Sequence, residues 1–302
     1  MCGFIGVASR KDINNSFIKD ADKFLTCRGP DDQKWSENSL DNYKTLFSFH
    51  RLSIIDLSPE ASQPMSSEKY NTEILFNGEI YNHLELRKEM ELDGIKFSTS
   101  HSDTETLLLG LSEHGSKFIE KVDGQFSIVL LNKNLNTITL IRDRLGQKPL
   151  YYFIDRDNFI FSSNFKSVLS YKKRFDLDQS QIANFLELGC IPAPYTLDKE
   201  IKKLLPAEIL EFSLETFSVR EKTKYWRIED YVDENKFEKE KFFNLFNYSV
   251  KKRLLSDVPI ANLLSGGIDS TSIIKSQFDN KVKNINTFTI KNTEKQYDES
   301  GW

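Results

Sequence analysis

The sequence has few cysteines, few histidines and no long apolar segment. Its three cysteines, Cys2, Cys27 and Cys190, are widely spaced and odd in number. This pattern argues against a disulfide framework and favours a reducing compartment, so we expect a cytoplasmic protein. The four histidines form no ligand pattern with the cysteines, and we expect no metal site in this chain. No run reaches the roughly 20 apolar residues of a membrane span, and the apolar stretch 4–8 is too short for a signal peptide.

The chain also lacks a strong excess of one charge. Lysine and arginine total 41 and acidic residues 45, giving a net charge of −4. The basic groups at 202–203 and 251–253 are short, so we expect no nucleic-acid partner. With 302 residues, of which 39% are hydrophobic, the chain is long enough for two domains and a sizeable core.

The N-terminus begins Met-Cys-Gly-Phe-Ile-Gly-Val. If the initiator methionine is removed, Cys2 carries both a thiol and a free α-amine. The amine has a pKa of roughly 7.7–8.0 and the thiol one of about 8.5. The amine can therefore take the thiol proton as the sulfur attacks an amide carbon. A cysteine at this position is alternatively an inert, small apolar side chain beside the buried strand predicted at 4–7, and this stretch alone leaves both interpretations open.

Strand-like segments with a few amphipathic helices make up the first part of the chain. Helices are predicted at 14–26 and 83–92, with another beginning near Ser102. The predicted strands are 4–7, 45–50, 73–76, 125–131, 137–141, 151–154 and 159–161. This order favours an α+β architecture of stacked sheets flanked by helices. We place the first domain at residues 2–190 and a proline-containing connecting region, with two strands near 208–224, at 191–236.

Two short motifs in the first domain have competing interpretations. Asn77-Gly78 is typical of a tight hairpin turn, yet it could also present a side-chain amide and a backbone N–H to one point, as an oxyanion hole requires. Ser102 and Glu105 fit a capping box, a structural role. Asp103, in the first turn of that helix, could still point into a site.

The last segment, residues 237–302, begins with a helix at 237–255 and continues as a strand–loop–helix–strand pattern. A strand at 259–264 precedes the loop Ser265-Gly266-Gly267-Ile268-Asp269-Ser270, followed by a helix at 269–278 and a strand at 285–290. A glycine-rich turn before a helix offers converging N–H groups to an anion such as phosphate. The loop lacks the lysine of a Walker motif and the spacing of a dinucleotide fingerprint. A glycine-serine turn that binds nothing is the alternative.

Taken together, these residues resemble the glutamine-hydrolysing asparagine synthetases, in one collinear order from residue 2 to about residue 299. The motifs that carry the resemblance are the N-terminal Met-Cys-Gly-Phe-Ile-Gly, Arg28-Gly29-Pro30-Asp31, Arg51-Leu52-Ser53-Ile54-Ile55-Asp56, Asn77-Gly78-Glu79-Ile80-Tyr81-Asn82, Ser102-Asp103-Thr104-Glu105, Arg142 to Tyr152, and Ser256-Asp257-Val258-Pro259 leading to Ser265–Ser270.

The resemblance implies an N-terminal-nucleophile glutaminase with a four-layer αββα sandwich. Cys2 would be the nucleophile, and Asn77 and Gly78 would form the oxyanion hole. Arg51 would hold the α-carboxylate of glutamine and Asp103 its α-amine, with Glu79 nearby. The implied glutamine-binding residues are Arg51, Leu52, Ser53, Ile54, Ile55, Asn77, Gly78, Glu79 and Asp103. The glutaminase step needs no cofactor.

Residues 237–302 resemble the beginning of an ATP pyrophosphatase domain that uses ATP with Mg²⁺. The implied ATP-binding residues are Leu264, Ser265, Gly266, Gly267, Asp269, Ser270 and Ile290. The family reaction converts L-aspartate, L-glutamine and ATP to L-asparagine, L-glutamate, AMP and pyrophosphate. The implied small-molecule partners are glutamine, ATP and aspartate, and a homodimer or a complementary synthetase chain is the expected protein partner.

In the family, the second domain continues for many residues past the position that corresponds to Trp302. Because this chain stops at Trp302, within the synthetase domain, we expect it to act chiefly as a glutaminase and not to make asparagine alone. Two alternatives remain open. One is an amidotransferase that acts on a different carboxylate acceptor. The other is a non-catalytic remnant that binds glutamine or a nucleotide.

Overall fold

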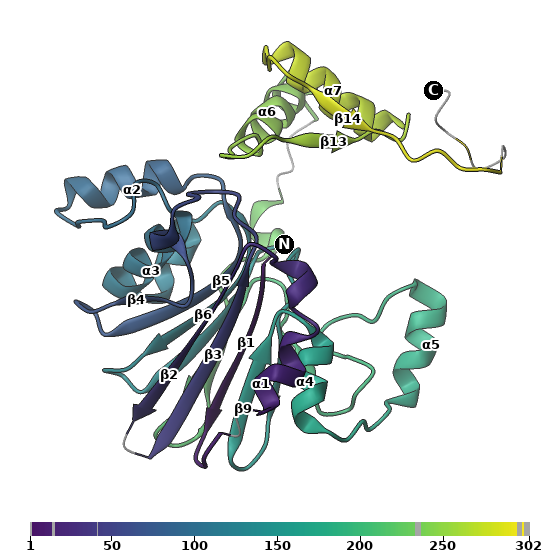
Figure 1. Ribbon diagram of the computed structural model, residues 1–302. Helices are drawn as coiled ribbons and strands as arrows, with labels where there is room; N and C mark the ends of the chain where they lie inside the picture. The colour runs from purple at the N-terminus through teal and green to yellow at the C-terminus, as the bar shows by residue number, and fades with distance from the viewer. Residues whose placement is uncertain (1, 14–15, 41, 233–236, 295–297, 299–302) are drawn as a thin grey trace. The chain divides into compact units, whose positions relative to one another are not determined.

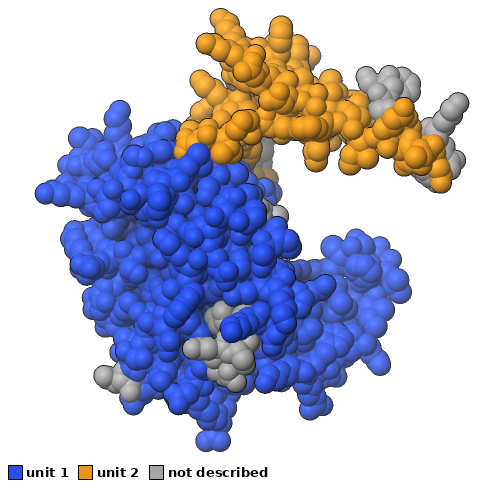
Figure 2. Space-filling model, in the orientation of Figure 1, with its two compact units in different colours: residues 1–231 blue, residues 232–302 orange. Residues whose placement is uncertain are grey.

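The computed structural model describes residues 2–13, 16–40, 42–232, 237–294 and 298. The chain divides into two compact units, residues 1–231 and 232–302 (Figure 2). The predicted removal of Met1 and the end of the chain at 299–302 lie outside the described residues. Among the described residues, no helix combines the length and apolar character needed to cross a bilayer.

Two six-stranded sheets form the first unit. The first sheet has the order β10-β8-β9-β1-β3-β2, and all its pairings are antiparallel. Its strands are β1 (Gly3–Ser9), β2 (Asp32–Leu40), β3 (Tyr43–Arg51), β8 (Tyr151–Ile154), β9 (Asn158–Ser162) and β10 (Lys202–Lys203). The central strand β1 pairs with β3 on one side and with β9 on the other.

The second sheet has the order β12-β11-β7-β6-β5-β4, again antiparallel throughout. Its strands are β4 (Met65–Ser67), β5 (Thr72–Ile80), β6 (Gly124–Asn132), β7 (Thr137–Arg142), β11 (Glu208–Ser213) and β12 (Ser218–Lys224). Strand β5 pairs with β6 over its whole length but with β4 only over 72–74. Among the described residues, no strand lies beside the rest of that edge of β5.

Helices cover the outer face of each sheet (Figure 1). The helices α2 (His83–Leu92) and α3 (Asp103–His114) pack on the second sheet, and α1 (Ser16–Asp22) and α4 (Phe165–Lys172) pack on the first. A fifth helix, α5 (Gln179–Leu188), carries mostly exposed residues. Single turns of 3₁₀ helix occur at Thr26–Arg28, Pro59–Ala61 and Ile228–Tyr231, and a longer one at Gly115–Lys121.

The period-two alternation of the strands builds the core between these layers. In β1, Phe4 and Ala8 face the second sheet, whereas Ile5 and Val7 face α1 and α4. In β5, Leu75 faces the first sheet, whereas the residues on either side of it face α2 and α3. The order of layers is thus helices, sheet, sheet, helices, and the predicted αββα sandwich is confirmed.

The first unit extends further than the domain predicted at 2–190. The prolines near 192–206 indicated a connecting region, but β11 and β12 complete the second sheet. Leu210 and Phe212 of β11 are buried in the core between the sheets, and β11 pairs with β7. The division between the units therefore falls at 231/232, near the end of the proposed region 191–236, and most of that region belongs to the first unit.

The second unit has a helix, α6 (Lys239–Lys252), followed by a strand–helix–strand pattern. Strand β13 (Ala261–Leu263) pairs in parallel with β14 (Asn286–Phe288), and α7 (Ile268–Asp279) connects them. This agrees with the element types predicted there. Phe242 and Phe246, one turn apart on α6, stack with ring centroids 6.4 Å apart, as the apolar stripe of that helix predicts.

Candidate active site

Cys2 lies directly before β1, on the face that points between the two sheets. It shares this face with Phe4, two residues later, and it packs against the core between the sheets. Gly3 allows the segment around Arg28 to approach closely, because a Cβ at Gly3 would lie 3.1 Å from a methyl group of Leu25 and 3.3 Å from Cδ of Arg28. Arg28 donates from Nε to the carbonyl oxygen of Cys2 at 3.2 Å. The segment around Arg28 therefore holds the backbone next to the thiol.

The thiol of Cys2 contacts the backbone just after β3. The N–H of Leu52 donates to Sγ at 3.3 Å, and Sγ lies 3.5 Å from the carbonyl oxygen of Leu52. These residues meet because Gly3 pairs with His50 in the sheet. Burial raises the pKa of the Cys2 thiol, and the N–H of Leu52 partly opposes this effect. A base close to the sulfur would therefore be needed to make the thiolate near neutral pH.

A cavity of about 110 Å³ opens beside Cys2, which is room for several water molecules. Its walls come from the N-terminus, the segment after β3, β5, the start of α3 and the loop before β8. The lining residues are Cys2, Arg51, Leu52, Ile54, Ile55, Ala61, Gln63, Phe76, Asn77, Gly78, Glu79, Asp103, Thr104 and Lys148. Eight of the nine residues predicted to bind glutamine are among them. The exception is Ser53, whose N–H instead donates to the carboxylate of Asp31 at 2.7 Å.

Arg51, the last residue of β3, is a buried cation on the cavity wall. Its guanidinium donates to the carbonyl oxygen of Ser58 at 2.8 Å, to Oγ of Ser62 at 3.4 Å and to the carbonyl oxygen of Asp56. These acceptors are all neutral, and among the described residues no ion pair between Arg51 and a carboxylate is found. A buried charge without a counterion is costly, so this arrangement favours an anionic ligand.

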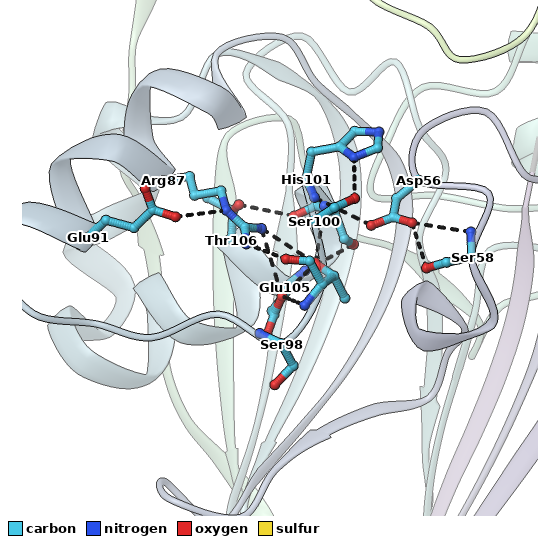
Figure 3. A network of polar contacts seen from close by, with 11 residues as sticks. Asp56, Ser58, Arg87, Glu91, Ser98, Ser100, His101, Glu105 and Thr106 are labelled. Carbon is cyan, nitrogen blue, oxygen red and sulfur yellow. Dashed lines mark hydrogen bonds and ion pairs between the residues drawn. The ribbon is translucent and has the colours of Figure 1, made fainter.

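Asp56 connects the loop around Arg51 to the segment that precedes α3 (Figure 3). Its carboxylate accepts hydrogen bonds from Ser58, at 3.2 Å from the N–H and 2.6 Å from Oγ, and from the N–H of His101 at 3.4 Å. Burial raises the pKa of Asp56, but these hydrogen bonds outweigh it and the net shift is downward. Asp56 therefore stays ionised and joins the loop that follows Arg51 to the segment that precedes Asp103.

Glu105 fixes the segment before α3 from the other side (Figure 3). Its carboxylate accepts from the N–H groups of Ser98 at 2.6 Å and Thr99 at 2.8 Å, and it lies 3.8 Å from the guanidinium of Arg87. Ser102 caps the helix by accepting from the N–H of Glu105 at 3.4 Å. Half of the predicted capping box is thus confirmed, while the Glu105 side chain binds the preceding loop instead.

Asp103, the first residue of α3, is buried and lines the cavity. Its Oδ2 accepts from the N–H of Ile80 at 3.2 Å. Burial raises the pKa of Asp103 to about 7, the nearby charge of Glu79 adds to the rise, and the N–H of Ile80 opposes it. Two acidic groups therefore share one end of the cavity, an arrangement that a cationic ligand group would stabilise.

Asn77 and Gly78 lie within strand β5, so the hairpin interpretation is wrong. Asn77 faces the other sheet, and the one hydrogen bond that its Nδ2 makes to a described residue is long, 3.5 Å to Oγ of Ser127. Gly78 pairs with Phe126, and a Cβ at Gly78 would lie 2.1 Å from the carbonyl oxygen of Gln125. Only glycine fits between these strands. The side chain of Asn77 and the edge of β5 at Gly78 border the same cavity.

The sequence did not reveal three polar residues of the cavity wall: Gln63, Thr104 and Lys148. Lys148 lies in the run from Arg142 to Tyr152 that carried the resemblance, but nothing in that run distinguished its side chain. It is buried, and burial lowers the pKa of its ammonium group, opposed by the carboxylate of Glu79. Gln63 binds both Thr104 and the backbone of β5.

In the second unit, the predicted anion loop lies between β13 and α7. Gly267 is the N-cap of α7, and Gly266 has a φ of +80°, a conformation that favours glycine. Oγ of Ser265 lies 3.3 Å from Oγ of Ser270. Leu264 follows β13, Asp269 lies in the first turn of α7, and Ile290 follows β14 with an exposed side chain. The loop thus exposes two hydroxyls at a helix N-terminus.

Metal ions in proteins are bound by sets of histidine, cysteine and carboxylate side chains that lie close together. Among those residues, no group of three or more histidines, cysteines, aspartates and glutamates is arranged to hold a metal ion. The cysteines Cys2, Cys27 and Cys190 are all free.

Comparisons with known proteins match both parts of the chain. Residues 1–226 match the family model described as a glutamine amidotransferase domain, and residues 241–302 match the model described as asparagine synthase. The chain is 34% identical over 284 residues to asparagine synthetase (glutamine-hydrolyzing) 1 of Bacillus subtilis (strain 168), covering 91% of this chain and 43% of that protein. It is 33% identical over 326 residues to a putative asparagine synthetase (glutamine-hydrolyzing) 2 of Methanocaldococcus jannaschii, covering 99% of this chain and 61% of that protein.

A similar fold occurs in a solved structure of glutamine phosphoribosylpyrophosphate amidotransferase from B. subtilis in complex with ADP and GMP. The TM-score is 0.54 at 14% identity, covering 98% of this chain and 68% of that one. The chain spans about half the length of the curated relatives that it matches.

Proposed function

Because this chain belongs to the glutamine amidotransferase domain family over residues 1–226, we propose that it hydrolyses the side-chain amide of glutamine with Cys2 as the nucleophile. One observation carries the proposal. A single small cavity collects the thiol of Cys2, the cation of Arg51, the oxyanion candidates Asn77 and Gly78, and the acid Asp103 from separate segments of the chain. These groups match the parts of one zwitterionic amide substrate.

The charges at the cavity wall support one orientation of glutamine. Arg51 would hold the α-carboxylate, because its planar guanidinium can donate to both oxygens. Asp103 would accept from the α-ammonium group, with the carboxylate of Glu79 nearby. Leu52, Ile54 and Ile55 would contact the aliphatic part of the substrate. The side-chain amide would then lie at the sulfur of Cys2.

With Met1 removed, the α-amine of Cys2 would act as the base. It takes the thiol proton as sulfur attacks the amide carbon, and the carbonyl π electrons move to oxygen. Nδ2 of Asn77 and the N–H of Gly78 donate to this oxyanion. When the C=O bond re-forms, the C–N bond breaks, and the departing nitrogen takes the proton from the amine and leaves as ammonia. Water then attacks the thioester and the amine accepts its proton. When the C–S bond breaks, the leaving sulfur takes this proton from the amine, which gives glutamate, the thiol and the free amine.

We further propose that residues 237–302 begin an ATP-binding synthetase domain, so that the whole protein makes asparagine from aspartate, glutamine and ATP. The hydroxyls of Ser265 and Ser270 and the N-terminus of α7 would bind the pyrophosphate part of ATP. Mg²⁺ would neutralise the phosphates there, and oxygen ligands of this kind suit it. We propose a cytoplasmic enzyme, with a homodimer or a complementary synthetase chain as its protein partner.

Ammonia release from glutamine tests the glutaminase half. The wild-type chain should release ammonia, and Cys2→Ala should reduce the rate to background with an unchanged circular dichroism spectrum. Cys190→Ala, which removes an exposed thiol after α5, is the matched control and should keep full activity. An unaltered rate in Cys2→Ala, or no ammonia from the wild-type chain, would reject the proposal.

Equilibrium binding of ATP with Mg²⁺ tests the second half separately. The double substitution Ser265→Ala with Ser270→Ala should weaken binding, whereas Ser272→Ala, further along α7, should not. Equal weakening by both, or no binding to the wild-type chain, would argue against the proposed phosphate loop.

A further inference from the structure

The edge of β5 that borders the cavity has three different partners, at Ile74, Phe76 and Ile80, and Gly78 lies between the last two. The ladder between β4 and β5 pairs Met65 with Ile74. If this register continued, the backbone of Gln63 would pair with Phe76 and the backbone of Ala61 with Gly78. The chain instead leaves the strand before Met65, because Pro64 has no N–H and Pro59–Ala61 forms a 3₁₀ turn.

The side chain of Gln63 replaces the missing strand at Phe76. Its Oε1 accepts from the N–H of Phe76 at 2.6 Å, and its Nε2 donates to the carbonyl oxygen of Phe76 at 3.1 Å. A side-chain amide carries the same donor and acceptor as a peptide group, so it completes the pairing that a backbone would have made. Gln63 and Phe76 are both buried, where unpaired backbone groups would be costly.

At the next position along this edge, the N–H of Gly78 has no strand opposite it. Phe126, its cross-strand neighbour in β6, uses its own backbone groups on the other side, where its N–H donates to Asp143 at 3.2 Å and its carbonyl accepts from Asp143 at 2.9 Å. The backbone groups of Gly78 therefore point away from β6 and toward the cavity edge. One step further on, the N–H of Ile80 donates to Asp103.

Gln63 also contacts the start of α3. Its Nε2 donates to Oγ1 of Thr104 at 3.2 Å, and Thr104 directly follows Asp103. One buried side chain thus binds β5 two residues before the oxyanion candidate Gly78 and binds α3 next to the residue proposed to hold the substrate amine. The side chain of Asp103 makes a second connection between α3 and β5, through the N–H of Ile80 on the far side of Gly78.

We propose that Gln63 is a positioning residue for the glutaminase reaction. It completes the pairing on the outer edge of β5 at Phe76, in place of β4, and the N–H of Gly78 beyond it is left free and aimed at the oxyanion. The inference rests on the proposed function, since an oxyanion forms only if Cys2 attacks an amide. The side chain of Gln63 does not itself contact the reacting atoms.

The two hydrogen bonds between residue 63 and the backbone of Phe76 require a side-chain amide, which glutamine supplies. Gln63→Glu keeps an acceptor for the N–H of Phe76 but loses the donor to its carbonyl and to Thr104, and Gln63→Met loses all three hydrogen bonds. Both variants free β5 to shift at Gly78. Because oxyanion donors act mainly in the transition state, the loss should appear in kcat and not in KM.

The experiment measures kcat and KM for ammonia release, together with the affinity for the γ-aldehyde analogue of glutamine, which forms a tetrahedral adduct with the thiol. Gln63→Met should lower kcat by about 10–100-fold, less than or equal to the loss of a whole oxyanion donor, with KM changed less than about threefold. The affinity for the aldehyde should fall by a similar factor. The affinity for glutamine should be the same in Cys2→Ala and in the double variant Cys2→Ala with Gln63→Met. Gln181→Met, at a buried glutamine of α5, is the control and should leave all values unaltered.

Thr104→Val provides a second variant that is milder for folding, because it removes one of the three hydrogen bonds. It should lower kcat by about threefold to tenfold, in the same direction as Gln63→Glu. If wild type releases ammonia but Gln63→Met, Gln63→Glu and Thr104→Val change only KM, or none changes kcat more than Gln181→Met, the inference is wrong while the proposed function survives. If wild type releases no ammonia, both fall.

Discussion

The carboxylate of Asp103 accepts a hydrogen bond from the N–H of Ile80 at 3.2 Å, which joins the first turn of α3 to the end of β5. In the same carboxylate, burial raises the pKa to about 7. The group that we propose to hold the α-ammonium of glutamine is therefore half-protonated near neutral pH. Its ionisation should control how the protein binds its substrate.

The pH profile of glutamine hydrolysis should report this ionisation. Below about pH 7, Asp103 in the free enzyme is protonated and cannot pair with the α-ammonium of glutamine, so kcat/KM should fall as the pH decreases. The α-amine of Cys2 must also be unprotonated to act as the base, so the acidic limb should contain two ionisations. Asp103→Asn should lower kcat/KM above pH 7 and leave an acidic limb that reports the Cys2 amine alone. An acidic limb of unchanged shape in Asp103→Asn would exclude Asp103 from this pH dependence.

The same shift predicts how stability depends on pH. The folded pKa of Asp103 is raised from 3.8 to about 7, so between these values the folded chain keeps a proton that the unfolded chain has lost. The free energy of unfolding of the wild-type chain, relative to that of Asp103→Asn, should therefore be highest below about pH 4. This advantage should be lost as the pH rises through 7. Urea unfolding of both proteins at several pH values measures this difference. A constant difference across that range would contradict the prediction.

Arg51→Lys should weaken glutamine binding with little effect on turnover. Lysine keeps the charge but loses the fork that donates to both the loop carbonyls and a carboxylate. A charge-assisted hydrogen bond contributes about 1.5–3 kcal/mol, so KM should rise about 10–100-fold. Arg10→Lys, whose side chain lies on the exposed end of the sandwich over Phe217, is the control. An unchanged KM in Arg51→Lys would remove Arg51 from the proposed binding mode.

Gly78→Ala should impair both stability and activity. The added Cβ would lie 2.1 Å from the carbonyl oxygen of Gln125, so β5 and β6 must separate locally. Such overpacking typically costs about 1–3 kcal/mol of unfolding free energy. Because the N–H of residue 78 would move as well, kcat should fall by about 100-fold or more. Urea unfolding combined with ammonia release checks both effects, and a stable variant with full turnover would exclude Gly78 from the oxyanion hole.

Most of the candidate site could be predicted because its residues lie in short, distinctive motifs. Cys2, Arg51, Asn77, Gly78 and Asp103 were each singled out in the sequence, and all of them line one cavity. Gln63 could not be found in this way. Its role depends on a side chain that occupies a backbone position in the β4–β5 register, and a pattern of residue types does not show that substitution.

The parts of the fold that were missed have equally specific causes. Strand β2 carries a largely polar and exposed sequence, Asp32–Leu40, because it lies at the edge of its sheet, so it lacks an apolar pattern. Strands β11 and β12 match the two strands expected near 208–224, but the prolines before them favour a linker on sequence grounds. Only the pairing of β11 with β7, far apart in sequence, assigns them to the sandwich.

The central claim is that the N-terminal cysteine supplies both the nucleophile and its base. The most direct test is mass spectrometry of the N-terminal peptide after the full chain is incubated with a diazoketone analogue of glutamine, which alkylates the attacking sulfur. We predict a peptide that begins at Cys2, lacks Met1 and carries one adduct on the Cys2 sulfur, in step with the loss of ammonia release. A fully active protein that retains Met1, or inactivation with the adduct on Cys27 or Cys190, would contradict the account.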